Sequence, residues 1–227
     1  MNVSRVIDMA NREDRPVLEA ALEGGEVIVD VLMRGEVLAE VPVIGTAIKI
    51  CKAADAIRDK AFAAKLAQFV RNLDSMSEEH RRKLREKVAS APHEAQKLGE
   101  TLLFVIERVT DLDKPLLLAQ LFLAYLDDVL SSDELRRLSQ AVDTAFADDL
   151  KQLLERHKLP EKSDELWLEC LVPSGLTRLV AGQTYDELGR LYYEVTPFGN
   201  KLRNAYFYGR KYTANSASQR TPASGRR

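Results

Sequence analysis

The sequence has few of the residues that build disulfide frameworks or metal sites. Its two cysteines, Cys51 and Cys170, lie far apart in a chain of 227 residues, and neither belongs to a Cys-x-x-Cys motif. This pattern excludes a disulfide-rich fold and fits a reducing cytoplasm. The three histidines, His80, His93 and His157, share no ligand spacing. We therefore expect no metal site and no cofactor.

Motifs of nucleotide and nucleophilic chemistry are missing as well. Gly24-Gly25 lacks the spacing of a phosphate-binding loop and the Lys-Ser/Thr that follows one. There is no Gly-x-Ser-x-Gly elbow, and neither cysteine has a base near it in the sequence. The sequence therefore predicts a protein that is not an enzyme.

Long hydrophobic runs are also absent. The N-terminus lacks the unbroken apolar core of a signal peptide, so export is not expected. The stretch Val27–Ile50 leans apolar but is interrupted by five charged residues, which a membrane-spanning helix rarely tolerates. The pattern predicts a cytoplasmic protein.

What the chain does contain is one short, almost wholly apolar stretch, Leu116–Leu126. Gln120 is its only polar residue. A helix that is apolar on every side belongs in the middle of a bundle or in a bilayer, and a bilayer needs about 20 such residues. We expect a mainly α protein, a helical bundle around this buried central helix, with Gln120 hydrogen-bonded to a neighbouring helix.

A long helix is predicted over Val43–Leu73, where small and apolar residues recur at a spacing of three and four. Arg58 falls within its apolar side, and Asp55 lies three residues earlier. We predict that Asp55 and Arg58 form a buried ion pair that fixes the register of the helix. The alternative is that Arg58 binds a ligand in a cleft.

Capping motifs place the next helices. Ser75–Glu78 has the spacing of a capping box, and it precedes a charged segment that is typical of a solvated surface helix and includes His80. Pro92 opens another helix, since proline is tolerated in a first turn.

A second capping box, Ser131–Glu134, begins a long amphipathic helix that we expect to reach about Arg156. Phe146 is among the residues predicted to face inward.

The best domain boundary is Lys158–Ser163, which combines a proline with mixed charges. It divides the chain into a helical core domain (1–157), a small α+β unit (158–212) and a disordered basic tail (213–227). In the α+β unit the pattern predicts a short helix over 164–171, strands over 176–181 and 191–195, and a closing helix that starts at Thr196-Pro197.

Two motifs in this unit are similar to the end of a winged-helix domain of bacterial regulators. They are Leu171-x-x-x-Gly175-Leu176 and Tyr193-x-Val195-Thr196-x-x-Gly199-x-x-Leu202. The resemblance implies a winged-helix-like unit. Its short helix 164–171 departs from the regulators because it carries three acids and no base, whereas a recognition helix must approach phosphates.

The helical part resembles a widespread family of uncharacterised bacterial proteins. The resemblance is carried by Val41–Thr46, by Ile57-Arg58-Asp59-x-x-Phe62 and by Leu116–Leu150. Such proteins pair a helical domain with a degenerate winged helix and often lie near phage-related or defence genes. The absence of catalytic motifs and the acidic short helix predict a non-enzymatic module that binds a protein partner, and the resemblance implies that it acts as a component or effector of phage defence.

Two alternatives stay open. In the first, the C-terminus binds nucleic acid, because basic and aromatic residues alternate there with no acidic residue after position 199. The candidate residues are Lys201, Arg203, Arg210, Lys211, Tyr206 and Tyr212. They could equally form a closing helix that packs its aromatic rings on the core and turns its charges to solvent. In the second, glycine-containing helices near the N-terminus enter a membrane after a rearrangement. The pattern leaves the oligomeric state open.

Overall fold

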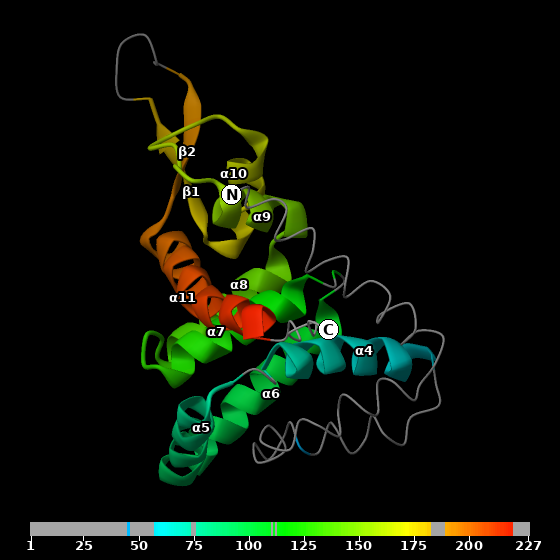
Figure 1. Cartoon of the computed structure of the whole chain (residues 1–227). Coiled ribbons are helices and arrows are strands. Elements are labelled where there is room, and N and C mark those ends of the chain that lie inside the picture. The colour runs from blue at the N-terminus through cyan, green and yellow to red at the C-terminus, as the bar shows by residue number, and fades with distance from the viewer. Residues whose placement is uncertain are drawn as a thin grey trace, which may run out of the picture.

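The computed structural model describes residues 45, 57–73, 76–109, 111, 113–182 and 189–219, and it describes only the backbone of 57–61 and 213–219. Over these residues the protein is mainly helical and carries one small antiparallel sheet (Figure 1). The glycine-containing segment before residue 42 and most of the first half of the helix predicted over 43–73 lie outside the described residues. No helix in the described ranges is both long and apolar enough to cross a bilayer.

The helix α7 (Lys114–Leu126) is buried on nearly every side. Leu116 is its only residue that is not fully buried. It packs against α4 (Ile57–Leu73), α8 (Ser132–Thr144) and α11 (Pro197–Gln219). The apolar surface of α7 on all sides explains this placement, because each side needs a neighbour that excludes water.

Gln120 lies in the middle of α7 and is 3% exposed. Its side-chain oxygen has no hydrogen-bond partner among the described residues, so the predicted bond to a neighbouring helix is wrong for this atom. The backbone of Gln120 lies instead directly beneath Gly209 of α11, and a Cβ atom at Gly209 would come within 2.3 Å of the Gln120 carbonyl oxygen. The close approach of two helix backbones leaves little room at this point for a polar neighbour.

The next two helices begin with local signals. The helix α5 (Glu78–Ser90) is capped by Ser77, whose Oγ accepts a hydrogen bond from the His80 backbone N–H at 3.2 Å. The cap is therefore Ser77 rather than the predicted Ser75. The helix α6 (Pro92–Arg108) starts at Pro92, as predicted.

The long helix predicted from Ser131 to about Arg156 is two helices. Its start is confirmed, since Ser131 and Glu134 form both hydrogen bonds of a capping box. However, α8 ends at Thr144 and α9 (Ala147–Glu155) follows after two residues with extended backbone, Ala145 and Phe146. Phe146 is 61% exposed, so its predicted inward position is also wrong.

A physical reason for the break is visible on both sides of it. Asp148 and Asp149 lie in the first turn of α9, where a negative charge is favourable beside the free N–H groups. The change of direction lets Leu150 and Leu153 reach the core that Leu138 and Val142 of α8 already join. Burial of these leucines outweighs exposure of one phenylalanine.

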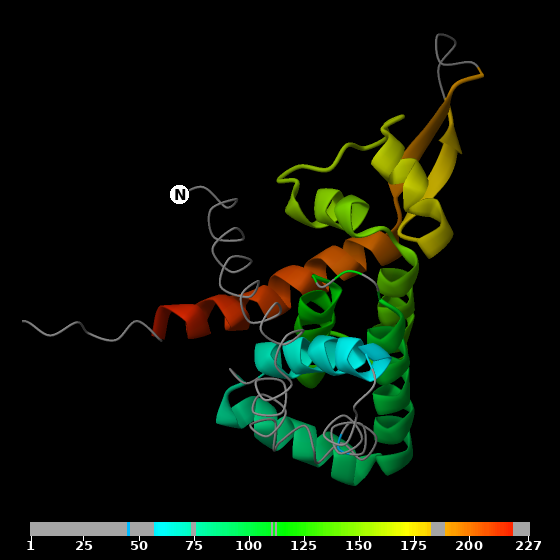
Figure 2. The ribbon, with the colours of Figure 1, turned by 90° about the vertical axis from the view of Figure 1, so that its right-hand side faces the viewer.

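The C-terminal part holds the sheet. The short helix α10 (Leu166–Cys170) and the 3₁₀ turn η2 (Val172–Ser174) precede the hairpin of β1 (Thr177–Ala181) and β2 (Leu191–Val195). The strands are antiparallel, with Thr177 opposite Val195 and Ala181 opposite Leu191. Both views show the hairpin and α5 at opposite ends of the molecule (Figures 1 and 2).

Thr196 joins the hairpin to α11. Its Oγ lies 2.8 Å from the carbonyl oxygen of Gly175 and accepts a hydrogen bond from the N–H of Gly199 at 3.0 Å. A Cβ atom at Gly199 would come within 2.2 Å of the Leu176 carbonyl oxygen. The Gly-Leu and Thr-x-x-Gly motifs of the sequence therefore meet in space, and the absence of a side chain at Gly199 permits the contact.

The core is continuous across the predicted boundary at 158–163. Leu168 and Leu171 before the hairpin, and Leu202 and Ala205 of α11, belong to the same buried cluster as the residues of α7. The closing helix also continues to Gln219, into the segment predicted as a disordered tail, while 220–227 lie outside the described residues.

Candidate functional site

The densest polar cluster in the described part of the chain surrounds Asp127, the residue that ends α7. Its Oδ1 accepts from Lys83 Nζ at 2.7 Å, and its Oδ2 lies 3.0 Å from His80 Nε2 and accepts from the Tyr208 hydroxyl at 3.0 Å. The Asp127 side chain is 7% exposed. One carboxylate thus ties α5 and α11 to the end of α7.

The hydrogen bonds around Asp127 determine whether Asp127 and Tyr208 carry a charge. Burial alone would raise the pKa of Asp127, but hydrogen bonds from Lys83, His80 and Tyr208 lower it to about 2. The pKa of Tyr208 is raised by its hydrogen bond with Tyr212, by burial and by the Asp127 charge. Asp127 is therefore ionised at neutral pH, and Tyr208 keeps its proton.

The cluster also aligns a hydroxyl, an imidazole and a carboxylate. Ser77 Oγ lies 3.1 Å from His80 Nδ1, on the ring edge opposite Asp127. The same order of groups activates a serine in hydrolases. Here the hydroxyl oxygen already caps α5, and the carboxylate is shared with Lys83 and Tyr208. We interpret the cluster as a structural clamp.

The charged helix α5 lies at the surface, as predicted, but His80 is one of its two buried residues. It is 2% exposed, and the ring of Tyr212 meets it edge-on with centroids 4.6 Å apart. The sequence offered only a weak signal, a histidine three residues after a capping serine. Its partner Asp127 is 47 residues away, which a pattern of spacings does not connect.

The candidate nucleic-acid residues of α11 contact other parts of the protein. Lys201 pairs with Glu134 of α8, and Arg203 donates to the carbonyl oxygens of Leu153 and Arg156 at the end of α9. The Arg203 guanidinium also lies over the Phe207 ring, 5.1 Å from its centroid.

The remaining candidates are engaged in the same way. Arg210 interacts with Tyr206, a largely buried residue whose pKa is raised by burial. Lys211 Nζ lies 5.6 Å from the centroid of the Tyr208 ring, and Tyr212 packs on His80. The structure thus places all six on one helix but gives each a contact within the chain. Nucleic-acid binding by this set stays a prediction.

The ion pair predicted between Asp55 and Arg58 lies outside the described residues, since Asp55 and the side chain of Arg58 are not among them. In the described ranges, no group of three or more histidine, cysteine or acidic side chains could hold a metal ion.

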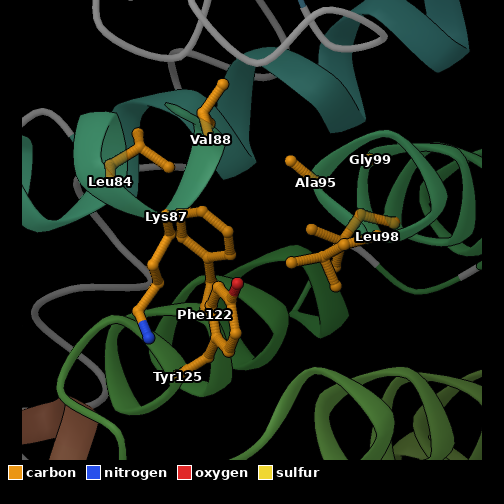
Figure 3. Close-up of a pocket in the computed structure, with 9 residues that line it drawn as sticks. Leu84, Lys87, Val88, Ala95, Leu98, Gly99, Phe122 and Tyr125 are labelled. Atoms are coloured by element: carbon orange, nitrogen blue, oxygen red, sulfur yellow. The ribbon is translucent and has the colours of Figure 1, made fainter. Parts of the chain in front are cut away.

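A shallow pocket lies between α5, α6 and α7 (Figure 3). Its lining is mostly apolar and includes Leu84, Leu98 and Phe122. The Lys87 ammonium lies 4.7 Å from the centroid of the Tyr125 ring and pairs with Asp128 at 2.5 Å. The lining offers apolar contact but no uncommitted charged group for catalysis.

The C-terminal hairpin presents a different kind of surface. Leu179 of β1 and Leu191 of β2 are 50% and 57% exposed. Because Ala181 faces Leu191 across the ladder, the side chains of Leu179, Ala181 and Leu191 lie on the same face of the sheet. We call these three residues the hairpin surface.

The helix that precedes the hairpin has no positive charge. Within α10 and its cap, Glu165 accepts hydrogen bonds from Arg156 and from Trp167, and Leu166 is 71% exposed. The hydrogen bond from Arg156 lowers the pKa of Glu165, so this carboxylate is ionised at neutral pH. Its charge is balanced by Arg156, so the exposed part of α10 includes the apolar Leu166 and the acidic Glu169.

No family model matches the chain, and neither a curated protein nor a solved structure matches it.

Proposed function

We propose that this protein is a cytoplasmic, non-enzymatic interaction module that binds a protein partner through the hairpin surface. The observation that carries the proposal is the pair of half-exposed leucines, Leu179 and Leu191, on one face of a hairpin that projects from the helical body. Exposed apolar side chains gathered on one projecting element are typical of protein-binding sites.

The proposal also includes an interpretation of the two parts of the chain, the helices before residue 158 and the unit that follows them. We interpret the helices before residue 158 as a bundle around α7, supported by the burial of that helix, and residues 158–212 as a degenerate winged-helix-like unit. Ser163 supports the second interpretation, because it exchanges two backbone hydrogen bonds with Tyr193, at 3.0 and 2.7 Å, on the outer side of β2. It thereby forms an isolated antiparallel bridge beside β2, just before α10.

The acidic character of α10 favours a protein partner over DNA. In a winged helix that reads DNA, a helix at this place enters the major groove between two phosphate strands. Here Asp164 and Glu169 are exposed acids, and Leu166 is exposed between them. Glu165 is paired with Arg156. Such a surface is repelled by phosphate and gains by contact with apolar groups.

The biological setting that we propose is phage defence, with the protein acting as a component or effector of a bacterial system. This part rests on the resemblance of Val41–Thr46 and Leu116–Leu150 to a family found near defence genes. Membrane entry by the N-terminal segment remains an alternative for the effector step, and it requires a rearrangement that frees this segment.

The test is affinity capture from a lysate of the cells that make the protein. Three versions of the full chain serve as bait. They are the unchanged protein, the double variant Leu179→Asp/Leu191→Asp, and the control variant Phe104→Asp. Phe104 is 55% exposed on α6, so the control removes a similar apolar area elsewhere. We expect one partner to be lost only with the double variant, and purified partner to bind with the same dependence. Equal recovery by all three baits contradicts the proposal.

A further inference from the structure

One face of the hairpin emerges from beneath α10. Side chains at directly opposed positions of an antiparallel ladder lie on the same face. This face carries three such pairs, Thr177 with Val195, Leu179 with Tyr193, and Ala181 with Leu191. Thr177 is 2% exposed and its hydroxyl donates to the Leu168 carbonyl of α10 at 2.6 Å, whereas Leu191 at the far end is 57% exposed. The base of the face is therefore covered by α10, and the hairpin surface is the part of it that lies beyond this cover.

The helix α10 borders the hairpin surface on one side. It packs against both strands (Figures 1 and 2). Glu169 directly follows the residue that accepts the Thr177 hydrogen bond, and it is exposed. Burial and the negative charge of Glu169 both raise the pKa of Tyr193, the residue opposite Leu179. The Glu169 carboxylate therefore lies beside the hairpin surface.

A second apolar side chain extends this region onto α10. Leu166 is 71% exposed and lies three residues before Glu169. Residues at this spacing are neighbours on the surface of a helix. The exposed leucines of the hairpin and of α10 thus meet at a corner, and Glu169 is the acid at its border.

The charges of these elements are divided between two sides. The charged residues of α10, β1 and β2 are Glu169, Arg178 and Glu194. Arg178 and Glu194 alternate with the residues of the hairpin surface, so they lie on the opposite face of the sheet. There they neutralise each other, since Arg178 Nε donates to the Glu194 carboxylate at 2.6 Å. The side that carries the exposed leucines is left with the negative charge of Glu169.

We infer that the partner presents a basic, amphipathic segment to this corner, with an apolar side chain on Leu179 and Leu191 and a lysine or arginine beside Glu169. The inference rests on the proposed function, because it states the chemistry of the partner that binds the hairpin surface. A charge at the border of an apolar contact favours the opposite sign in the partner and disfavours the same sign. An acidic segment would bring like charges together at Glu169.

The leucines and the acid have separate roles in this contact. Burial of apolar side chains supplies most of the binding free energy, whereas a charge at the border chiefly selects the partner. Loss of the leucines is therefore expected to abolish binding of every segment. Reversal of the charge at residue 169 is expected to change which segments bind.

The test is selection from a random peptide library displayed on phage, with the full chain as target. We expect the wild type to enrich peptides that combine leucine, isoleucine or phenylalanine with lysine or arginine. Glu169→Lys should enrich acidic peptides of similar apolar content. Glu100→Lys is the matched control, because Glu100 is an exposed acid of α6 that accepts one side-chain hydrogen bond, from Gln96 at 2.9 Å. It should enrich the same basic peptides as the wild type.

Fluorescence anisotropy then measures the Kd of one selected basic peptide. Glu169→Lys should weaken binding about tenfold, because one exposed ion pair is lost and one repulsion is gained. Glu169→Gln removes the charge and keeps the size of the side chain, and it should weaken binding about threefold without enriching acidic peptides. Leu179→Asp/Leu191→Asp should abolish binding. Circular dichroism reports whether each variant folds.

The inference is overturned if the wild type enriches acidic or uncharged peptides, if it enriches nothing, or if Glu169→Lys enriches the same peptides as the wild type. Peptides or a captured partner that bind through Leu179 and Leu191 without dependence on charge refute the basic segment and leave the proposed function standing. Basic peptides that depend on Glu169, together with a lysate that yields no partner, support the charge preference of the surface and count against the proposed function.

Discussion

Gly209 of α11 lies against the backbone of Gln120 in α7, so closely that a Cβ atom would come within 2.3 Å of the Gln120 carbonyl oxygen. Two helices distant in sequence thus pack backbone to backbone at the centre of the core. The contact explains why a glycine stands inside α11, where it costs about 1 kcal/mol of helix propensity relative to alanine.

Gly209→Ala should therefore destabilise the protein despite the better helix propensity of alanine. The added methyl group forces α11 away from α7, and overpacking of this kind costs about 1–3 kcal/mol. Urea unfolding followed by circular dichroism measures the change, with the exposed Asn200→Ala on the same helix as control. A Gly209→Ala protein as stable as the control would show that the helices separate without cost.

Asp127→Asn should lower the free energy of unfolding by about 3 kcal/mol, because it leaves Lys83 and the buried His80 without their anionic partner. Asp128→Asn is the matched control. Its side chain is 79% exposed, its pairing with Lys87 is worth at most about 1 kcal/mol, and asparagine tolerates its positive φ of 59°. Equal losses in the two variants would contradict the role of Asp127 as a clamp.

The stability should also depend on pH through Asp127. Its pKa is about 2 in the folded protein and 3.8 when unperturbed, so the unfolded chain binds the proton more readily. The contribution of about 2 kcal/mol is present above pH 4 and is lost as the pH falls toward 2. Denaturation midpoints between pH 2 and 6 should fall more steeply for the wild type than for Asp127→Asn. Parallel curves for the two proteins would refute the assignment.

Binding of nucleic acid through α11 can be tested without removing the helix. Truncation after residue 199 would delete Leu202 and Ala205 from the core, so point variants are required. Fluorescence anisotropy with duplex and single-stranded DNA at two salt concentrations should show no salt-sensitive binding, because Lys201 and Arg203 already have partners in the chain. Binding that weakens with salt, and weakens further in Lys201→Gln/Lys211→Gln, would establish the alternative function.

Local signals in the sequence located several elements correctly. Pro92 starts α6, Ser131 and Glu134 cap α8, and the alternation of Leu176–Ala181 marks β1. In each case the cause lies within a few residues: a missing N–H, a side chain that caps a helix, or side chains that alternate between two faces. Short-range causes of this kind can be predicted from the sequence.

The break between α8 and α9 could not be predicted in the same way. No glycine or proline marks Ala145-Phe146, and the apolar pattern continues across it. The helix stops because Leu150 and Leu153 reach the core only after a change of direction, and that depends on where the core lies.

The sequence by itself determined that the chain is mainly helical, that its C-terminal part carries a hairpin, and that α7 has no side suited to water. Only the tertiary structure brings His80 and Tyr208 within hydrogen-bond distance of the Asp127 carboxylate. His80 lies 47 residues before Asp127 in the sequence, and Tyr208 lies 81 residues after it. The tertiary structure also decided that Ser163 bonds to Tyr193 on the outer side of β2. The reason is physical: hydrogen-bond partners and neighbours are selected by distance in space, and spacing along the chain constrains that distance only within a few residues.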